Sequence, residues 1–141
     1  MVDKVAAILM LRDDGAALLQ HRDNKPGLRC AGMWGLPGGR AESGESMLDC
    51  ARRELLEETE YTASDLKFLL SQDGTDEYGV SFMVTFFWCQ YDGKQPVVCH
   101  EGQAMSFVER ELAESYAIPH YLFNIWDGGL AASCKTMKVS I

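Results

Sequence analysis

Hydrophobic residues run almost unbroken through positions 5–11 and return through positions 16–22, with Asp14 and Gly15 between the two runs. Short apolar runs that end at turn residues are typical of buried strands, and Asp-Gly between two of them indicates a hairpin. The pattern therefore predicts two paired strands near the N-terminus. A loop over residues 23–33 is expected to follow them.

The clearest strand pattern covers residues 80–91. Side chains at both alternating sets of positions are largely apolar there, which is typical of a strand inside a sheet that is covered on both faces. Shorter strands are expected at residues 34–36, 66–71 and 105–108. A polar turn is predicted over residues 72–79, just before the long strand.

A first helix is predicted from its apolar spacing and its start signal. Ser46 is a favourable N-cap residue, and the helix is expected to run from there to about Glu60. Leu48, Ala51 and Leu55 recur at helical spacing and form an apolar stripe that would pack on a core.

The C-terminal region predicts a second helix over residues 119–127. Proline is favoured at the first helical position and glycine just beyond the last one. Here Pro119 opens the segment, while Gly128 and Gly129 close it. A short helical start is also expected at residues 109–115. Strands interleaved with helices in this way predict an α/β or α+β fold.

Composition and charge narrow the classes of function. A chain of 141 residues is long enough for one domain with a proper core, so we expect a single domain over residues 1–141. The net charge of −8 argues against binding to nucleic acid or to anionic membranes, and no apolar stretch is long enough to span a bilayer. Five scattered cysteines without metal-site spacing favour reduced thiols in a cytoplasmic protein.

Three glutamates on the first predicted helix give the strongest chemical signal. Glu54, Glu57 and Glu58 are spaced i, i+3 and i+4, so they share one helix face. Like charges at this spacing destabilise a helix unless a cation lies between them. Mg²⁺ is the hard divalent ion that suits carboxylate oxygens. Arg53, four residues before Glu57, is within reach of an ion pair that would orient its carboxylate.

The spacing around these glutamates extends back into the preceding loop. Gly39 is followed after five residues by Glu45, and seven residues later the segment REL-x-EE begins at Arg53. This resembles the Nudix box, Gx5Ex7REUxEExGU with U aliphatic, and the preceding WxLPGG segment also fits the family pattern. The departures are Glu60 at the usual glycine and Tyr61 at the final apolar position. Glu60 must therefore either end the helix in the left-handed conformation or let the helix continue.

The resemblance implies a fold, a metal and a reaction. The fold is the Nudix fold, α/β (α+β) with a mixed β-sheet sandwiched between α-helices. The reaction is Mg²⁺-dependent hydrolysis of a pyrophosphate bond in a nucleoside di- or triphosphate derivative, with Mn²⁺ as a substitute metal and cleaning of the dNTP pool as a candidate role. Carried over position by position, the metal ligands are the Gly39 carbonyl, Glu54, Glu57 and Glu58. Glu54 is also a candidate general base.

Three further residues are expected to serve these carboxylates. The resemblance implies that Arg53 orients them and that Glu45 braces the loop against the helix. Glu101 precedes the predicted strand at residues 105–108, where similar family members carry a glutamate on a loop that faces the metals. Glu101 is therefore a second candidate for the general base or for a metal ligand. The alternative is an ordinary exposed loop glutamate.

Substrate contacts are less sharply specified than the metal site. The candidates are Arg22 for a phosphate, and Tyr78, Tyr121 and Asn124 near positions that differ between Nudix subfamilies. For base stacking the candidates are Trp34, Phe82, Phe86 and Trp88, although aromatic residues on strands more often belong to the core. The expected partner is a small-molecule nucleotide, bound by a monomer or a homodimer. Alternative functions are a hydrolase of dinucleoside polyphosphates or nucleotide sugars, and a nucleotide-sensing domain without turnover. A third is an isoprenoid diphosphate isomerase, which would use Cys30 or Cys89.

Overall fold

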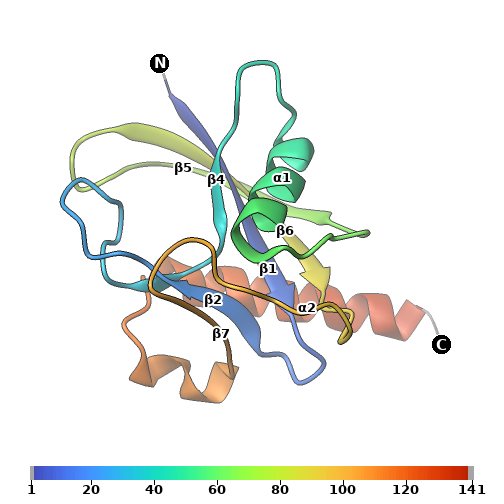
Figure 1. Cartoon of the computed structure of the whole chain (residues 1–141). Coiled ribbons are helices and arrows are strands. Elements are labelled where there is room, and N and C mark those ends of the chain that lie inside the picture. Colours follow the sequence, from blue (N-terminus) through green and yellow to red (C-terminus); the bar gives the residue numbers. More distant parts are fainter. Residues whose placement is uncertain (1, 140–141) are drawn as a thin grey trace.

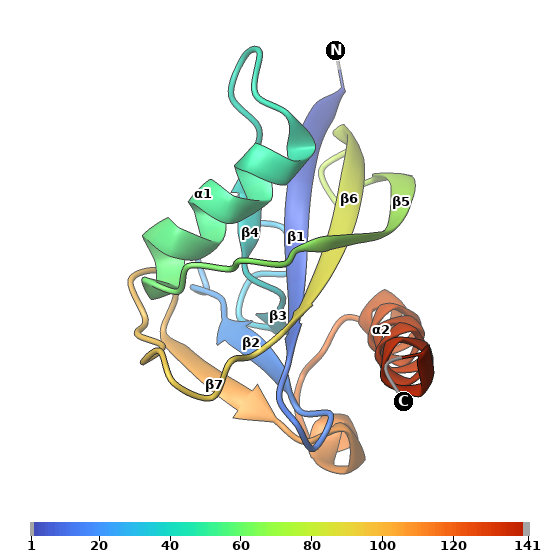
Figure 2. The same ribbon diagram turned by 90° about the vertical axis from the view of Figure 1, so that its right-hand side faces the viewer.

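A mixed β-sheet lies between two helices (Figure 1). The computed structural model describes residues 2–139, with side chains described through residue 134. Helix α1 (Met47–Thr59) covers one face of the sheet and helix α2 (Tyr121–Val139) covers the other (Figure 2). This arrangement confirms the predicted α+β fold with a sheet between helices.

Seven strands form the sheet. Their bounds are β1 (Asp3–Leu11), β2 (Ala17–His21), β3 (Trp34–Gly35), β4 (Gly38–Arg40), β5 (Lys67–Thr75), β6 (Ser81–Gln90) and β7 (Ala104–Val108). Neighbours run in the order β3-β2-β1-β6-β5, while β4 also pairs with β1 and β7 with β2. Only the β1–β6 pair is parallel among the pairs formed by the described residues. A short 3-10 helix, η1 (Arg110–Ser115), leads from β7 towards α2.

Two hydrophobic cores form because successive side chains of a strand point to opposite faces of the sheet. The core on the α1 side includes Ile8, Leu18, Leu55 and Phe87. The core on the α2 side includes Leu9, Phe86, Trp88, Leu122 and Trp126. The consecutive residues Phe86 and Phe87 thus serve different cores. Strand β6, which lies between β1 and β5, is the inner strand that the sequence predicted.

The predicted N-terminal hairpin is right only next to its turn. β1 and β2 pair at Leu11 and Ala17, and then the two strands diverge. The same edge of β1 is occupied further along by β4, with Ala6 opposite Gly39, so β2 pairs with β7 and β3 instead. Strand β4 was not predicted, because its Gly-Gly sequence is typical of a turn rather than of a strand.

Strand β5 is longer than predicted, and the polar turn is shorter. The prediction of a turn from residue 72 is wrong, because the polar residues 72–75 still pair with β6, for example Asp73 with Met83. The turn itself is held by Asp76, whose Oδ1 accepts hydrogen bonds from the backbone amides of Tyr78 and Val80, both at 2.9 Å.

The predicted end of the C-terminal helix at Gly128 and Gly129 is wrong, because α2 continues through both glycines. A Cβ atom on Gly129 would lie 2.1 Å from Cδ2 of Leu9 on β1. Glycine at this position therefore lets the helix approach the sheet closely, and it does not mark a helix end.

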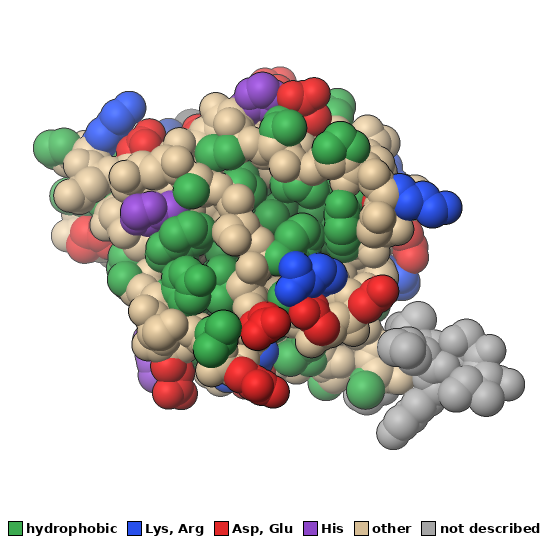
Figure 3. Space-filling view, turned by 60° about the horizontal axis from the view of Figure 1, so that its bottom comes forward, with side chains coloured by type: hydrophobic (Ala, Val, Ile, Leu, Met, Phe, Trp, Pro, Cys, Tyr) green, Lys and Arg blue, Asp and Glu red, His purple; other side chains and the backbone are tan. Residues whose placement is uncertain are grey.

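The face that carries β7 and η1 is shown in Figure 3, where hydrophobic side chains gather in the middle and acidic groups lie at several points around them. The partly buried hydrophobic residues Tyr91, Met105 and Phe107 pack against the core on the α1 side. None of the helices described is both long and apolar enough to cross a membrane.

Candidate active site

Helix α1 presents its glutamates from a firmly anchored position. The hydroxyl of Ser46 accepts a hydrogen bond from the amide of Asp49 at 3.1 Å, as expected for an N-cap. Ala51 and Leu55 are fully buried in the core on the α1 side. The helix ends at Glu60, which adopts the left-handed conformation with φ of 63°. Of the two outcomes expected for Glu60, the structure therefore has the helix end and not its continuation.

Glu58 is the most deeply buried of the three glutamates, with 3% of its surface exposed. The amide of Gly38 donates a hydrogen bond of 2.9 Å to its Oε2. Its Oε1 is the only buried side-chain polar atom within the described residues that lacks a hydrogen-bond partner. Burial, followed by a hydrogen bond that the protonated carboxyl can donate to Glu101 and by the charges of Glu101 and Glu54, raises the pKa of Glu58 to about 10. This carboxyl group needs either a proton or a cation to be stable where it lies.

Glu101 lies beside Glu58, on the loop that leads into β7. The amide of His100 donates to the main-chain carbonyl of Glu58 at 2.8 Å, and the side chain of Gln20 donates from Nε2 to the carbonyl of Glu101 at 2.9 Å. Gly102 adopts φ of +83°, and a Cβ there would lie 2.6 Å from the carbonyl oxygen of His21. These contacts hold the loop so that Glu101 faces the buried glutamate.

Arg53 connects four acidic or carbonyl groups around the site. Its guanidinium donates to both oxygens of Glu45, at 2.7 and 2.9 Å, and to the carbonyl of Arg40 at 3.0 Å. It also donates to Glu54 at 2.9 Å and to Glu57 at 3.3 Å. The bonds from Arg53 lower the pKa of Glu45 to about 2. The bracing expected of Glu45 and the orienting expected of Arg53 both match these contacts.

Gly39 is packed directly against Glu54. A Cβ on Gly39 would lie 2.4 Å from the carboxyl carbon of Glu54, so a side chain here would displace that carboxylate. The carbonyl of Gly39 accepts a weak hydrogen bond from the thiol of Cys50, at 3.5 Å. Burial raises the pKa of Glu54. Strand β4 therefore brings a carbonyl oxygen next to the glutamates of the helix.

The oxygen donors gathered here suit a hard divalent cation. Within residues 2–139, however, no three acidic, histidine or cysteine side chains already adopt a metal-ligand arrangement. Glu54 and Glu57 are turned towards Arg53, and the side chain of Glu57 is 59% exposed. Binding of an ion would require Glu57 to rotate away from Arg53, which its exposure allows. The orphaned Oε1 of Glu58 is the group that such an ion would satisfy.

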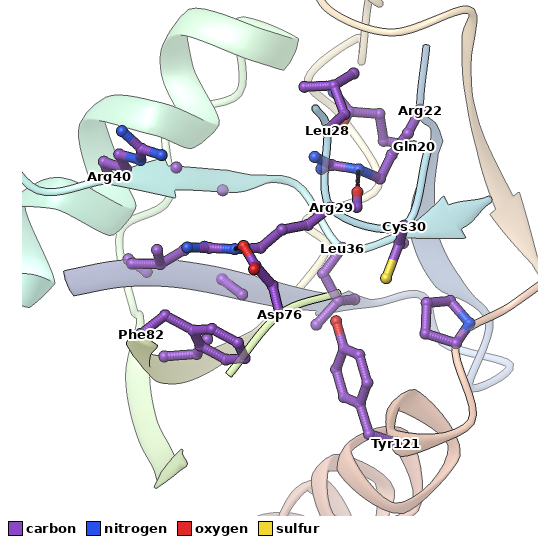
Figure 4. Close-up of a pocket in the computed structure, with 18 of the residues that line it drawn as sticks. Gln20, Arg22, Leu28, Arg29, Cys30, Leu36, Arg40, Asp76, Phe82 and Tyr121 are labelled. Atoms are coloured by element: carbon purple, nitrogen blue, oxygen red, sulfur yellow. Dashed lines mark hydrogen bonds and ion pairs between the residues drawn. The ribbon is translucent and has the colours of Figure 1, made fainter. Parts of the chain in front are cut away.

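A cleft of about 770 Å³ adjoins these residues. Its walls include Gly38, Gly39 and Glu101 from the carboxylate site. The rest of the lining drawn in Figure 4 comes from β1, β2, the loop over residues 23–33, Leu36, β4, the β5–β6 turn, β6 and the start of α2. A volume in this range holds a small organic ligand. The sequence predicted the carboxylate site, but it gave no outline of this cleft.

Four of the predicted substrate contacts line the cleft. They are Arg22, Phe82, Phe86 and Tyr121, and Figure 4 shows the hydroxyl of Tyr121 pointing into the pocket. The other four lie elsewhere, and Trp88 is buried in the core on the α2 side. Trp34 stacks on His21 with ring centroids 4.7 Å apart, the hydroxyl of Tyr78 accepts from the amide of Gly27 at 3.2 Å, and Asn124 is an exposed residue of α2.

Sequence reasoning missed several residues of the cleft. Gln20, Arg29, Arg40 and Asp76 all line it, and they come from four separated parts of the chain. One signal in the sequence could have found two of them. The chain is acidic and has 13 basic residues, and two of these, Arg29 and Arg40, lie on either side of the WxLPGG segment. The two cysteines considered for an isomerase are separated: Cys30 lines the cleft, whereas Cys89 is buried in the core on the α1 side.

Two curated relatives match part of the chain. The putative nudix hydrolase 1 of Caenorhabditis elegans is 36% identical over 85 residues, 57% of this chain and 22% of the relative. The putative 8-oxo-dGTP diphosphatase of Bacillus subtilis (strain 168) is 39% identical over 64 residues, 45% of this chain and 39% of the relative. The chain thus spans 22% and 39% of the lengths of these two relatives.

Solved structures match nearly the whole chain. A MutT protein from Methanosarcina mazei Go1 has a TM-score of 0.78 at 21% identity, covering 94% of this chain and 95% of that one. An Ap4A hydrolase of C. elegans in a binary complex also has a TM-score of 0.78 at 21% identity, with 95% and 99% coverage. At this level of identity the likeness shows a shared fold.

The family model of the NUDIX domain matches residues 1–124 of the chain. The matched region contains the WxLPGG segment, the glutamates of α1, Glu101 and every strand of the sheet. The match confirms the resemblance seen in the sequence, and the protein belongs to the NUDIX domain family.

Proposed function

We propose that this protein hydrolyses a pyrophosphate bond in a nucleoside di- or triphosphate derivative, with Mg²⁺ as its metal. One observation carries the proposal: Oε1 of Glu58 is buried without a hydrogen-bond partner, next to Glu54 and Glu101 and beside a cleft of about 770 Å³. A buried carboxylate cluster of this kind is stabilised by a cation. Hydrolysis of a phosphoanhydride requires cations to offset the charge of the phosphates.

The residues divide into ligands and supports. Glu54, Glu57, Glu58 and the carbonyl of Gly39 would hold the metal, with Glu101 as a further ligand. Bound Mg²⁺ would neutralise phosphate oxygens and lower the pKa of the attacking water. Arg53 keeps Glu54 oriented through a bond of 2.9 Å, whereas Glu57 would give up its 3.3 Å bond to Arg53 to reach the metal. Glu54 and Glu101 are the two candidates for the general base, since both adjoin Glu58.

The substrate is proposed as a class only. Arg22 and Tyr121 line the cleft and are suited to contact a phosphate and a sugar or base. The relatives and structural neighbours bear names that refer to 8-oxo-dGTP and to Ap4A, so cleaning of the dNTP pool and cleavage of a dinucleoside polyphosphate are both open to test. The free thiols of the chain fit a reducing compartment, and we place the reaction in the cytoplasm.

The test is release of phosphate or pyrophosphate from a panel of substrates, with and without Mg²⁺. The panel holds canonical and oxidised dNTPs, ADP-ribose, sugar nucleotides, a dinucleoside tetraphosphate and an isoprenoid diphosphate. The wild-type protein is compared with Glu57→Gln, which removes one ligand charge at an exposed position. Glu114→Gln, which changes an exposed glutamate of η1, is the matched control.

We expect Mg²⁺-dependent turnover that Glu57→Gln reduces by about 10²-fold or more and that the control leaves intact. Near-normal activity of Glu57→Gln would remove Glu57 from the metal site. A folded protein that binds metal but cleaves nothing in the panel would contradict the proposed reaction on these substrates, and it would favour a nucleotide-sensing domain.

A further inference from the structure

Arg29 lies in the cleft with nearly every part of its guanidinium engaged. Its Nη2 contacts Oδ2 of Asp3 at 3.1 Å, and its Nε contacts Oδ2 of Asp76 at 3.0 Å. Its Cζ lies 4.6 Å from the centroid of the Phe82 ring. Figure 4 shows the side chain extending across the pocket, with Asp76 and Phe82 beside it. One arginine thus joins the loop over residues 23–33 to β1, to the β5–β6 turn and to β6.

The partners of Arg29 are themselves fixed. Asp3 and Phe82 are register partners on the parallel strands β1 and β6. The side chain of Asp76 is only 7% exposed, and its Oδ1 holds the β5–β6 turn. The amide of Cys30, next to Arg29, donates to Oε1 of Glu77 at 3.1 Å. The guanidinium is therefore held over the Phe82 ring by contacts that the protein itself supplies.

The charge around Arg29 is already balanced. Two carboxylates contact one guanidinium, and Asp3 also pairs with Arg40 at 3.3 Å. A phosphate that approached Arg29 would meet Asp3 and Asp76 as well, so the arginine gains little from it. Arg22 differs, because its Nε donates to the carbonyl of Arg29 at 2.8 Å and not to a carboxylate. Of the two arginines, Arg22 is the better phosphate contact.

We propose that Arg29, stacked on Phe82, is a specificity-determining residue whose free face stacks with the nucleobase of the substrate. A planar guanidinium can stack on aromatic rings, which an ammonium cannot do in the same way. Asp3 and Asp76 contact two edges of the guanidinium, and the Phe82 ring covers one of its faces. The opposite face is left for the cleft. Apolar side chains of Leu28, Leu36, Val84 and Phe86 line the same cleft. The inference rests on the proposed function, because it assumes a nucleotide substrate.

The test compares Arg29→Lys, which keeps the charge but loses the plane, with Arg110→Lys as a matched control. Arg110 also stacks on a phenylalanine, at 4.9 Å from Phe123, and pairs with a carboxylate, Asp127, at 2.9 Å. It lies on η1, and it is not among the residues that line the cleft. Phe82→Leu is the second variant, which keeps Arg29 and removes the ring beneath it. Thermal unfolding confirms that each variant folds.

Hydrolysis is measured for nucleoside triphosphates with different bases and for ribose 5-triphosphate, which has none. We expect Arg29→Lys to raise KM about tenfold for the nucleotides and to narrow the differences between bases. It should leave turnover of ribose 5-triphosphate unchanged, and the control should leave all substrates unchanged. An equal loss on ribose 5-triphosphate would mean that Arg29 acts on the phosphates or on the fold, and would overturn the proposal.

Binding of phosphate-free nucleosides gives a readout that does not depend on hydrolysis. In the wild-type protein, nucleoside binding should change the chemical shifts of Val84 and Leu36. The Kd obtained from these changes should rise about tenfold in both cleft variants. Weaker nucleoside binding by Arg29→Lys and Phe82→Leu would support base stacking on Arg29 even if the wild-type protein hydrolyses nothing. In that case only the proposed function fails. Nucleoside affinity that is the same in all variants would overturn base stacking on Arg29 even if hydrolysis is confirmed.

Discussion

Glu101 is the residue whose role depends most on its neighbour. Its proximity is a cause of the raised pKa of Glu58, and Gln20 and Gly102 fix the loop that carries it. We expect Glu101→Gln to slow kcat by about 10²-fold, since an amide keeps the size of the side chain but cannot accept a proton. The measurement is the steady-state rate at saturating Mg²⁺, with Glu109→Gln as a control outside the cleft. An unchanged rate would return Glu101 to the class of ordinary loop glutamates.

At the scale of single residues, the sequence predicted the site residues that share one helix. It missed residues of the cleft that the fold brings together from distant parts of the chain. Glu54, Glu57 and Glu58 share a face through local geometry, which residue spacing reports directly. The placing of Glu101 beside Glu58 required a resemblance, because a contact between residues so far apart in the chain has no local signal. The parallel pairing of β1 and β6 places Asp3 beside Phe82, and Arg29 reaches Phe82 from its loop through its ion pair with Asp3. That pairing was not predicted from hydrophobic alternation.

The end of α1 is the first element-scale feature that can be tested. Glu60 has φ of 63°, where a side chain costs about 1 kcal/mol and glycine costs nothing. Its carboxylate contacts the ring of His100, an exposed pair that contributes little. We therefore expect Glu60→Gly to raise the free energy of unfolding by up to about 1 kcal/mol, measured by urea denaturation. Glu60→Ala is the control, since it removes the same carboxylate but keeps the strain. A gain in Glu60→Ala equal to that in Glu60→Gly would show that strain is not the cause.

The two glycines of α2 provide a matched pair. A Cβ on Gly129 would lie 2.1 Å from Cδ2 of Leu9, whereas a Cβ on Gly128 would meet nothing within 4 Å. Gly129→Ala should lower the free energy of unfolding by about 1–3 kcal/mol through overpacking. Gly128→Ala should raise it by up to about 1 kcal/mol, because alanine favours the helix. Both values are measured by urea denaturation, and equal effects of the two substitutions would show that close packing does not explain Gly129.

The errors made for whole elements share one cause. Gly128-Gly129, the Gly-Gly of β4 and the polar residues of β5 each have a local preference for turns or helix ends. In each case a neighbouring strand decides the outcome. Leu9 on β1 leaves no room for a side chain at Gly129. β1 pairs with β4, and pairing with β6 extends β5. Strand β6 and helix α1, which have strong hydrophobic periodicity, were predicted close to their observed bounds. Hydrophobic periodicity predicts well because it records which side chains are buried in the tertiary structure. The exceptions were predicted from local turn preferences, which carry no such information.

At the scale of the whole molecule, stability should depend on pH and Mg²⁺ together. The folded protein without metal holds the pKa of Glu58 at about 10, against its usual 4.5. Between these values the folded state keeps a proton that the unfolded chain has released, so its stability falls as the pH rises. Mg²⁺ would take the place of this proton, which competes with the ion less at higher pH.

We therefore expect Mg²⁺ to raise the Tm and to do so more at pH 8 than at pH 6. At roughly 100 times the Kd the gain is about 2.7 kcal/mol, or about 5–10 °C for a domain of this size. Differential scanning calorimetry at both pH values provides the measurement. Glu58→Gln should abolish the Mg²⁺ effect and its pH dependence, while Glu114→Gln should keep both. A Tm that rises equally at the two pH values would separate metal binding from the titration of Glu58, and the buried carboxylate would then not be the group that the ion satisfies.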